Sequence, residues 1–204
     1  MANSVASKKP LAVPSEPLAN AIAAEWECQA KRVQPFTMPL MTLASTAIDM
    51  PREASTVDGM LCREAPGKLA TLQAETYEPI LDWARTRLGA KLQASDSIFG
   101  AKLPESDVAA VRAFLETLDN WHLTAVEHLA AACRSVLLAC AVVDGRVSVA
   151  DAIAVARLEE SAQIAQWGLV EGGHDVDIAD LKVRVAAPSV FLRLLKTAPQ
   201  QQQQ

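Results

Sequence analysis

The segment from Trp121 to Val143 constrains the fold most, because it is the most apolar of the helical patterns in the chain. Its apolar residues recur at intervals of three and four, which predicts a single helix. Asp144-Gly145 follows and ends it. The longest strictly apolar run, from Val136 to Val143, is far shorter than the roughly 20 residues of a membrane span. We therefore expect this helix to lie in the core of a folded protein, without membrane insertion.

The same spacing predicts helices over most of the remaining chain. Ser15, Thr37 and Ser148 are the expected N-caps of three of them. Gly89 is the expected C-terminal signal of a fourth, and Pro188 should kink the last helix. The expected helices other than 121–143 are 15–31, 38–48, 75–88, 105–118, 149–167 and 175–196.

The stretch from Pro51 to Lys68 has a different residue pattern, in which proline and glycine interrupt short apolar segments. Thr56-Val57 and Met60-Leu61-Cys62 are weak strand candidates within it. We therefore expect a mainly α protein, with a C-terminal orthogonal helical bundle and a reduced N-terminal α/β lobe. The expected division is a lobe over residues 1–70, a bundle over 71–198 and a disordered glutamine tail over 199–204.

Composition limits the classes of function. With 204 residues, half of them hydrophobic, the chain can build one sizeable core, or one core and a small added lobe. The net charge of -5 and the absence of long basic runs argue against nucleic acid as a partner. No secretory signal or convincing transit peptide is evident. The four cysteines lack a CxxC pair and are expected to be buried thiols in a reducing compartment, with neither disulfides nor a metal site.

Glu160 is the least expected residue in the 149–167 pattern, because helical counting places it in an apolar stripe. A carboxylate there costs several kcal/mol, as an order of magnitude, unless it is paired or hydrogen-bonded. One interpretation is a structural bond to an arginine or to a neighbouring helix start, and the other is a contact with a ligand or partner. The stripe consists of Val149, Ile153, Ala156, Glu160, Ile164 and Trp167.

Patterns that carry a catalytic mechanism are absent from the sequence, and we expect no catalytic residue and no cofactor. His122 and His128 are six residues apart, so one helix would place them on nearly opposite faces. His174 and Asp175 stand at a glycine-rich helix entrance, where Asp175 can cap the helix.

Several separate motifs, in a consistent order from Leu11 to Leu195, together resemble the mitochondrial ATP synthase assembly factor 2 family, the chaperones of the alpha subunit of the catalytic head. The motifs are LAVPS at 11–15, AEW at 24–26, MPL at 38–40, TAID at 46–49, PILDW at 79–83, LEE at 158–160, Gln163, WG at 167–168 and HD at 174–175. Family members carry a strand-rich segment ahead of the position of Leu11, where this chain has ten residues, so the resemblance implies a reduced N-terminal lobe.

The resemblance implies a non-enzymatic assembly chaperone of the mitochondrial matrix. It would bind the unassembled alpha subunit, as a monomer, and prevent its aggregation before alpha pairs with beta. Glu159, Glu160, Gln163 and Trp167 are the residues expected to form or support the client surface. Trp26, Trp83 and Asp49 are the expected structural anchors. Two alternatives stay open: a helical scaffold for a different partner, and an acid–base enzyme that uses Glu160 with a histidine.

Overall fold

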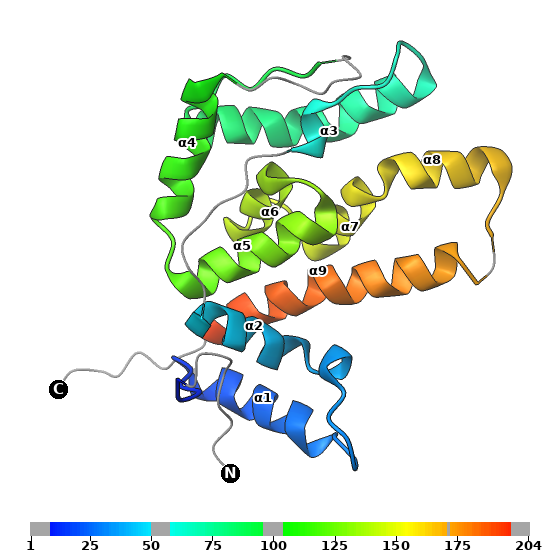
Figure 1. Cartoon of the computed structure of the whole chain (residues 1–204). Helices are drawn as coiled ribbons and strands as arrows, with labels where there is room; N and C mark the ends of the chain where they lie inside the picture. The colour runs from blue at the N-terminus through cyan, green and yellow to red at the C-terminus, as the bar shows by residue number, and fades with distance from the viewer. Residues whose placement is uncertain (1–8, 50–57, 96–103, 171, 197–204) are drawn as a thin grey trace.

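The computed structural model describes residues 9–49, 58–95, 104–170 and 172–196, and within them the protein is mainly α, as predicted (Figure 1). These residues contain no strand, and the isolated bridges among them include Asp58–Ser135 and Cys62–Ser95. The described elements are α1 (Glu16–Glu27), η1 (Pro35–Thr37), α2 (Pro39–Asp49), η2 (Gly59–Leu61), α3 (Lys68–Leu88), α4 (Glu105–Glu116), α5 (Asn120–Cys133), α6 (Val136–Val143), α7 (Val149–Ala156), α8 (Leu158–Trp167) and α9 (His174–Lys196).

The strand candidates of the N-terminal lobe have different outcomes. Met60-Leu61-Cys62 is wrong as a strand, because Met60 and Leu61 belong to the short 3-10 helix η2 and Cys62 follows it. Asp58 accepts a hydrogen bond from the Met60 amide and so closes this turn at its N-terminus. Thr56-Val57 lies outside the described residues. The division of the chain at residue 70 stays a prediction.

Local capping chemistry explains why several predicted boundaries are confirmed. The Ser15 hydroxyl accepts from the Leu18 amide and donates to the carbonyl of Leu194, so it starts α1 and ties it to α9. Ser148 caps α7, and Gly89 ends α3 in the left-handed region at φ 73°. The first helix ends at Glu27 and not near Lys31, and α3 begins earlier than predicted, at Lys68.

The start of α2 is capped from another helix, so the prediction of a Thr37 cap is wrong. The Glu25 carboxylate of α1 accepts hydrogen bonds from the amides of Leu40 and Met41, each at 2.8 Å. A negative charge at a helix N-terminus satisfies free amides and interacts favourably with the helix dipole. Thr37 instead donates to the carbonyl of Gln34 within η1.

The most apolar segment forms two helices, so the prediction of one helix over 121–143 is wrong. Arg134 adopts a left-handed conformation, with φ 55°, and Ser135 then caps α6 by accepting from the Leu138 amide. Asp58 also accepts from Ser135 Oγ and from the Leu137 amide. The break therefore creates a second helix start, which a distant carboxylate satisfies. Periodicity alone does not register such a break, because apolar residues continue through it.

The 149–167 helix is broken in the same way, at Arg157, into α7 and α8. Arg157 has φ -106° and ψ 10°, so the helical phase is not carried across it. The single apolar stripe inferred from Val149 to Trp167 is therefore wrong. None of the 10 residues of α8 is buried.

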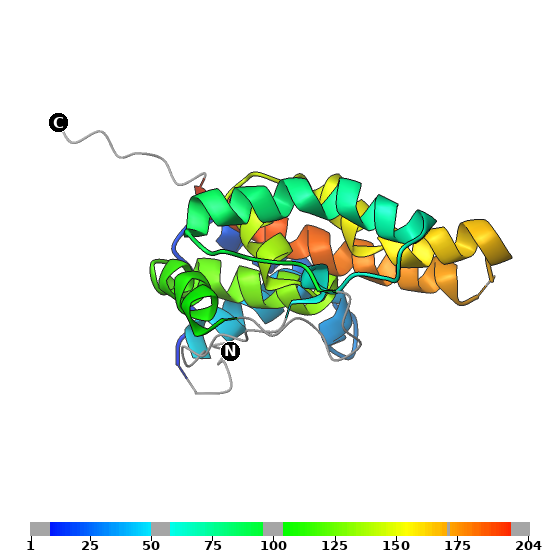
Figure 2. The ribbon, with the colours of Figure 1, turned by 90° about the horizontal axis from the view of Figure 1, so that it is seen from above.

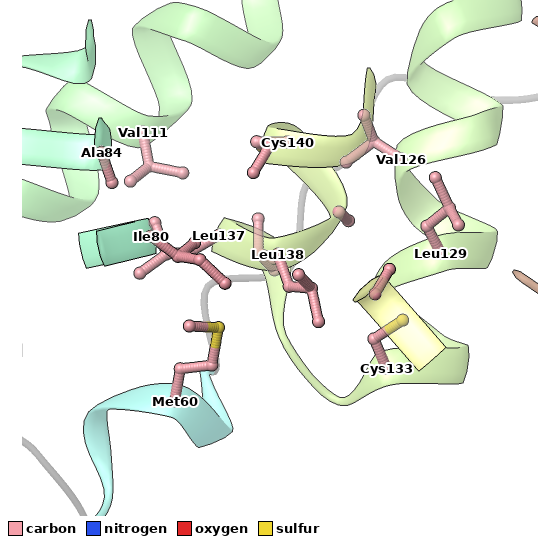
Figure 3. Packing of buried hydrophobic residues seen from close by; sticks show 14 of the residues in the cluster. Met60, Ile80, Ala84, Val111, Val126, Leu129, Cys133, Leu137, Leu138 and Cys140 are labelled. Carbon is pink, nitrogen blue, oxygen red and sulfur yellow. The ribbon is translucent and has the colours of Figure 1, made fainter. Parts of the chain in front are cut away.

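The central core lies around α6, whose residues from Leu138 to Ala141 are at most 1% exposed. Figure 3 shows Leu137 and Leu138 between Ile80 of α3 and the side of α5 that carries Leu129 and Cys133. A second cluster joins α1, α2 and the C-terminal end of α9 around Phe191. In Figures 1 and 2, α8 and the first half of α9 extend beyond these clusters on one side of the molecule.

The two halves of α9, on either side of Pro188, pack against different clusters. Leu181 and Val185 contact the central core, whereas Phe191 and Leu195 belong to the second cluster. The helix is continuous through Pro188. Among the described helices, none has the length and hydropathy needed to cross a bilayer.

Gly59 is required where η2 meets the end of α5, and its replacement by alanine should destabilise the fold. A Cβ at this position would lie 2.9 Å from the Arg134 carbonyl oxygen, which already accepts the Gly59 amide. We expect Gly59→Ala to lower the free energy of unfolding in urea by about 1–3 kcal/mol. Gly67→Ala is the control, because its nearest contact would be 3.8 Å away. Equal stability of both variants would contradict this account.

Asp58 should make stability depend on pH in a defined direction. Burial raises the pKa of its carboxyl above 3.8, against the opposing effect of its hydrogen bonds from Leu137, Met60 and Ser135. The native state therefore holds the proton more tightly than the unfolded state, and this contribution to stability is lost as the pH rises through the native pKa. Relative to Asp58→Asn, the wild type should gain stability as the pH falls from neutral towards 3.8. Urea unfolding of both proteins across that range measures the difference, and parallel curves would contradict the assignment.

Candidate functional site

Residues 158–170 and 172–184, from α8 through the first half of α9, form a helical arm that extends beyond the two core clusters on one side of the molecule (Figures 1 and 2). Gly168 and Gly172 have φ values of 89° and 74° at the turn between the helices, a conformation that favours glycine. The Val170 amide donates to His174 Nδ1 at 3.1 Å, and the His174 amide donates to the Val170 carbonyl. The arm is therefore a defined helical hairpin with a closed turn.

The prediction that Asp175 caps the last helix is wrong, and His174 instead closes the turn that precedes the helix. The helix α9 begins at His174, so Asp175 lies in its first turn and is not the cap. Its charge is still favourable there because of the helix dipole.

The end of the arm carries a concentrated apolar surface, which we call the apolar tip. Trp167 is 72% exposed, Leu169 53%, Val170 61% and Val176 59%. These four lie within ten consecutive residues, whereas the other exposed large apolar side chains among the described residues are Val33, Phe36, Val183 and Val190. Singly exposed apolar residues are ordinary, but a local group of them is typical of an interaction surface.

Glu160 is not a buried acid. Its side chain is 45% exposed, and Oε2 lies 3.0 Å from Nη1 of Arg157, whose own side chain is 9% exposed. The expectation of a carboxylate inside an apolar stripe is therefore wrong, because the helix breaks before it. The first interpretation, a structural bond to an arginine, describes this contact. The pair covers the buried guanidinium at the junction of α7 and α8.

Glu159 joins the arm to the body through Gln73, a residue that the sequence interpretation missed. Gln73 is 1% exposed, its Oε1 accepts from the Glu64 amide, and its Nε2 donates to Glu159 Oε1, both at 2.8 Å. The side-chain amide thus has a donor and an acceptor satisfied on opposite sides, as a buried amide requires. No sequence signal marked it, because a glutamine in a helix is usually exposed.

Tyr77, one turn further along α3, is the next group beside this contact. Burial raises the pKa of Tyr77 to about 12, the charge of Glu159 adds to the rise, and Arg63 opposes it. The Arg63 guanidinium lies 5.0 Å from the centre of the Tyr77 ring. The contact between α3 and α8 is therefore a polar seam that holds the base of the arm.

The structure divides the four expected client-surface residues into two groups. Glu159 and Glu160 make contacts that position α8, whereas Gln163 and Trp167 are exposed and lie one turn apart towards the tip. All four residues lie on α8 and reach solvent, but only Glu159 and Glu160 also contact other described residues through their side chains.

Two of the expected anchors pack against the two clusters. Trp83 lies against the central core and donates from Nε1 to Asp144 Oδ2 at 3.3 Å. Trp26 lies against the second cluster. Asp49 is the last residue of α2 and is half-buried, and its anchoring role stays a prediction.

The remaining chemically active side chains do not converge with Glu160. His122 pairs with Asp119 through Nδ1 at 2.8 Å, and residues 9–49, 58–95, 104–170 and 172–196 place no hydrogen bond between Glu160 and a histidine. Burial raises the pKa of Cys133 to about 11 and that of Cys140 to about 12.

The four cysteines are free but not equally buried. Cys133 and Cys140 are buried in the central core, although on two helices and not on one. Cys28 and Cys62 are exposed, so the expectation of buried thiols is wrong for these two. Cys28 follows the last residue of α1, and Cys62 follows η2, so each lies at the end of a helix and not on its packed face.

Comparison with known proteins places this architecture among chaperones. The family model described as ATP12 chaperone protein matches residues 4–85. The chain is 28% identical over 214 residues to the mitochondrial protein atp12 of Schizosaccharomyces pombe, covering 93% of this chain and 74% of that protein.

Two crystal structures share the fold over nearly the whole chain. Atp12 from Paracoccus denitrificans superposes with a TM-score of 0.82 at 29% identity, covering 95% of this chain and 88% of the other. A candidate chaperone from Agrobacterium tumefaciens superposes with a TM-score of 0.80 at 26% identity, covering 95% and 76%. The similarity therefore includes the arm as well as the helical core.

The seam between α3 and α8 should contribute measurably to stability. Glu159→Ala leaves the buried Nε2 of Gln73 without its acceptor, and we expect a loss of about 1–3 kcal/mol in the free energy of unfolding. Gln163→Ala on the exposed side of α8 is the control and should change it by less than about 0.5 kcal/mol. A double-mutant cycle with Gln73→Leu should recover a coupling of about 1 kcal/mol. A cost of Glu159→Ala that is the same in both backgrounds would show that the contact is not energetically coupled.

Proposed function

The chain belongs to the ATP12 chaperone protein family, and on this premise we propose that it is an assembly chaperone for the catalytic head of the mitochondrial proton-translocating ATP synthase. It binds the unassembled alpha subunit and prevents its aggregation until alpha pairs with beta. The observation that carries the proposal beyond the family is the apolar tip on a braced arm.

The physical basis is temporary cover of an apolar subunit surface. A subunit that waits for its permanent partner exposes an interface that is more apolar than ordinary surface and prone to aggregation. The apolar tip can cover part of such a surface with Trp167, Leu169, Val170 and Val176. A limited contact of this kind favours exchange, because beta must later replace the chaperone.

The residues of α8 have two roles in this proposal. Trp167 and Gln163 contact the client, with Trp167 as the principal anchor, because exposed tryptophans dominate many binding interfaces. Glu159 and Glu160 act through position: one holds α8 against α3, and the other covers Arg157 at the base of the arm. Replacing either acid therefore lowers client binding indirectly, because the position of the apolar tip changes.

The mode of action requires neither a catalytic step nor a cofactor, and a monomer suffices. The proposed location is the mitochondrial matrix. It is supported by the name of the fission-yeast relative, which describes a mitochondrial protein.

The most direct test is co-expression with the ATP synthase alpha subunit. We expect the wild-type chain to keep alpha soluble and to co-purify with it. Trp167→Ala should lower the recovered alpha by about tenfold or more, with little change in melting temperature, because the side chain is 72% exposed. Val190→Ala, an exposed valine distant from the tip along α9, is the matched control.

Glu160 variants separate positioning from direct contact. Glu160→Lys places two cations together at Arg157 and should reduce both alpha capture and stability, whereas Glu160→Gln keeps an acceptor and should do so less. Insoluble alpha in the presence of well-folded wild-type chain would refute the proposed function.

A further inference from the structure

A groove of about 290 Å³ opens between the N-terminal helices and the first half of α9, on a different part of the surface from the apolar tip. One wall comes from η1 and the start of α2, the other from α9, with His128 of α5 also lining the groove. Its apolar lining includes Pro35, Phe36, Pro39, Val183, Ala187 and Pro188.

At the groove, one face of α9 is no longer covered by α1 and α2. Near the C-terminus of α9, α1 and α2 pack on the helix and bury Phe191 completely. Towards the arm, Val183 is 53% exposed, and Phe36 on the opposite wall is 80% exposed. An aromatic side chain with this exposure beside an uncovered apolar helix face is typical of a surface that receives a partner.

The same face of α9 connects the groove to the apolar tip. Val176 and Val183 are seven residues apart, which places them on one side of the helix about 10 Å apart along its axis. Val176 belongs to the tip, and Val183 lines the groove. A single partner that covers the tip can therefore extend along α9 into the groove.

The charged part of the groove favours a carboxylate on the partner. Arg184 and Asp180, which both line the groove, form an exposed ion pair with Nη1 3.6 Å from Oδ2, longer than a hydrogen bond, and their side chains are 49% and 63% exposed. Of the five N–H donors of the guanidinium, none makes a hydrogen bond to another described residue. Burial lowers the pKa of His128, with Arg184 adding to the lowering and Glu127 opposing it, so the neighbouring imidazole is neutral near pH 7. The guanidinium therefore keeps N–H donors with which it can bind a second carboxylate, from the partner, beside that of Asp180.

The size of the groove indicates the kind of occupant. Pockets for small-molecule ligands span roughly 300–1,000 Å³ and enclose most of the ligand, whereas this groove is just below that range and open along one side. A groove of this shape suits a few side chains of a polypeptide.

We propose that this groove binds an apolar segment of the client whose neighbouring carboxylate pairs with Arg184, and that it forms a second contact continuous with the apolar tip. This inference rests on the proposed function, because it takes the alpha subunit as the occupant. Val176 of the tip and Val183 of the groove lie on the same helix, α9, so binding at the tip brings the client segment to the groove at high effective concentration.

The test compares groove variants with a matched valine on the same helix, using the alpha subunit co-expressed with each full-length chain. Val183→Ser and Phe36→Ser together should lower the alpha recovered per chain by about tenfold. Val190→Ser makes the same chemical change on α9 outside the groove lining and should leave recovery within about twofold. Because Phe36, Val183 and Val190 are exposed, melting temperatures should agree with the wild type and show that folding is intact.

Arg184 provides the second measurement. Arg184→Glu should lower recovery, and Arg184→Lys should restore most of it if charge is the basis of the contact. The wild-type complex should also weaken with salt more steeply than the Arg184→Glu complex.

The outcomes separate this inference from the proposed function. Suppose that the wild type retains alpha and Trp167→Ala loses it. Unchanged recovery of alpha with the groove variants would then overturn the groove proposal and leave the proposed function standing. If wild type retains no alpha, both proposals fall. A concentration-dependent dimer of the chain that the groove variants abolish would also overturn the inference, because the groove would then hold a second copy.

Discussion

The burial of α6, six of whose eight residues are buried, is the constraint on which the rest of the structure depends. Its eight residues, VLLACAVV, offer no polar face, so the helix is stable only when other elements surround it. Its N-terminus still needs partners for its amides, and Ser135 and Asp58 supply them inside the fold. One short helix thus requires both apolar cover on its sides and a carboxylate from a distant segment, which brings η2 against the end of α5.

The arm follows from how this requirement is met. The central core and the second cluster are completed by the other helices and the second half of α9, so α8 has no buried residue. An uncovered helix of 10 residues would be marginal without tertiary contacts. The Gln73–Glu159 bond and the Arg157–Glu160 pair hold its base, and the apolar residues gather at its other end. Because polar contacts hold the base of the arm, its apolar tip stays exposed and does not pack against the core.

The candidate site was only partly accessible to sequence reasoning. The motif from Glu159 to Trp167 indicated the right element, because its acids and tryptophan do not suit a simple core helix. The reason offered for Glu160 was wrong, since it assumed that the helical phase continues through Arg157. Gln73 and Glu25 could not be found by pattern, because their partners, Glu159 and the start of α2, depend on how distant helices pack. The groove beside Phe36 likewise arises from elements that are far apart in the sequence.

The sequence by itself determined the helical class, most helix positions and several of their ends, because helix periodicity and caps such as Ser15, Ser148 and Gly89 act over a few residues. Tertiary structure alone decided where the two long patterns break, which polar groups are buried, and which apolar residues remain exposed. Those outcomes depend on partners distant in the chain: Asp58 satisfies the helix start after Arg134, and Gln73 anchors α8. Local spacing carries no information about such partners, because they meet only when the helices pack.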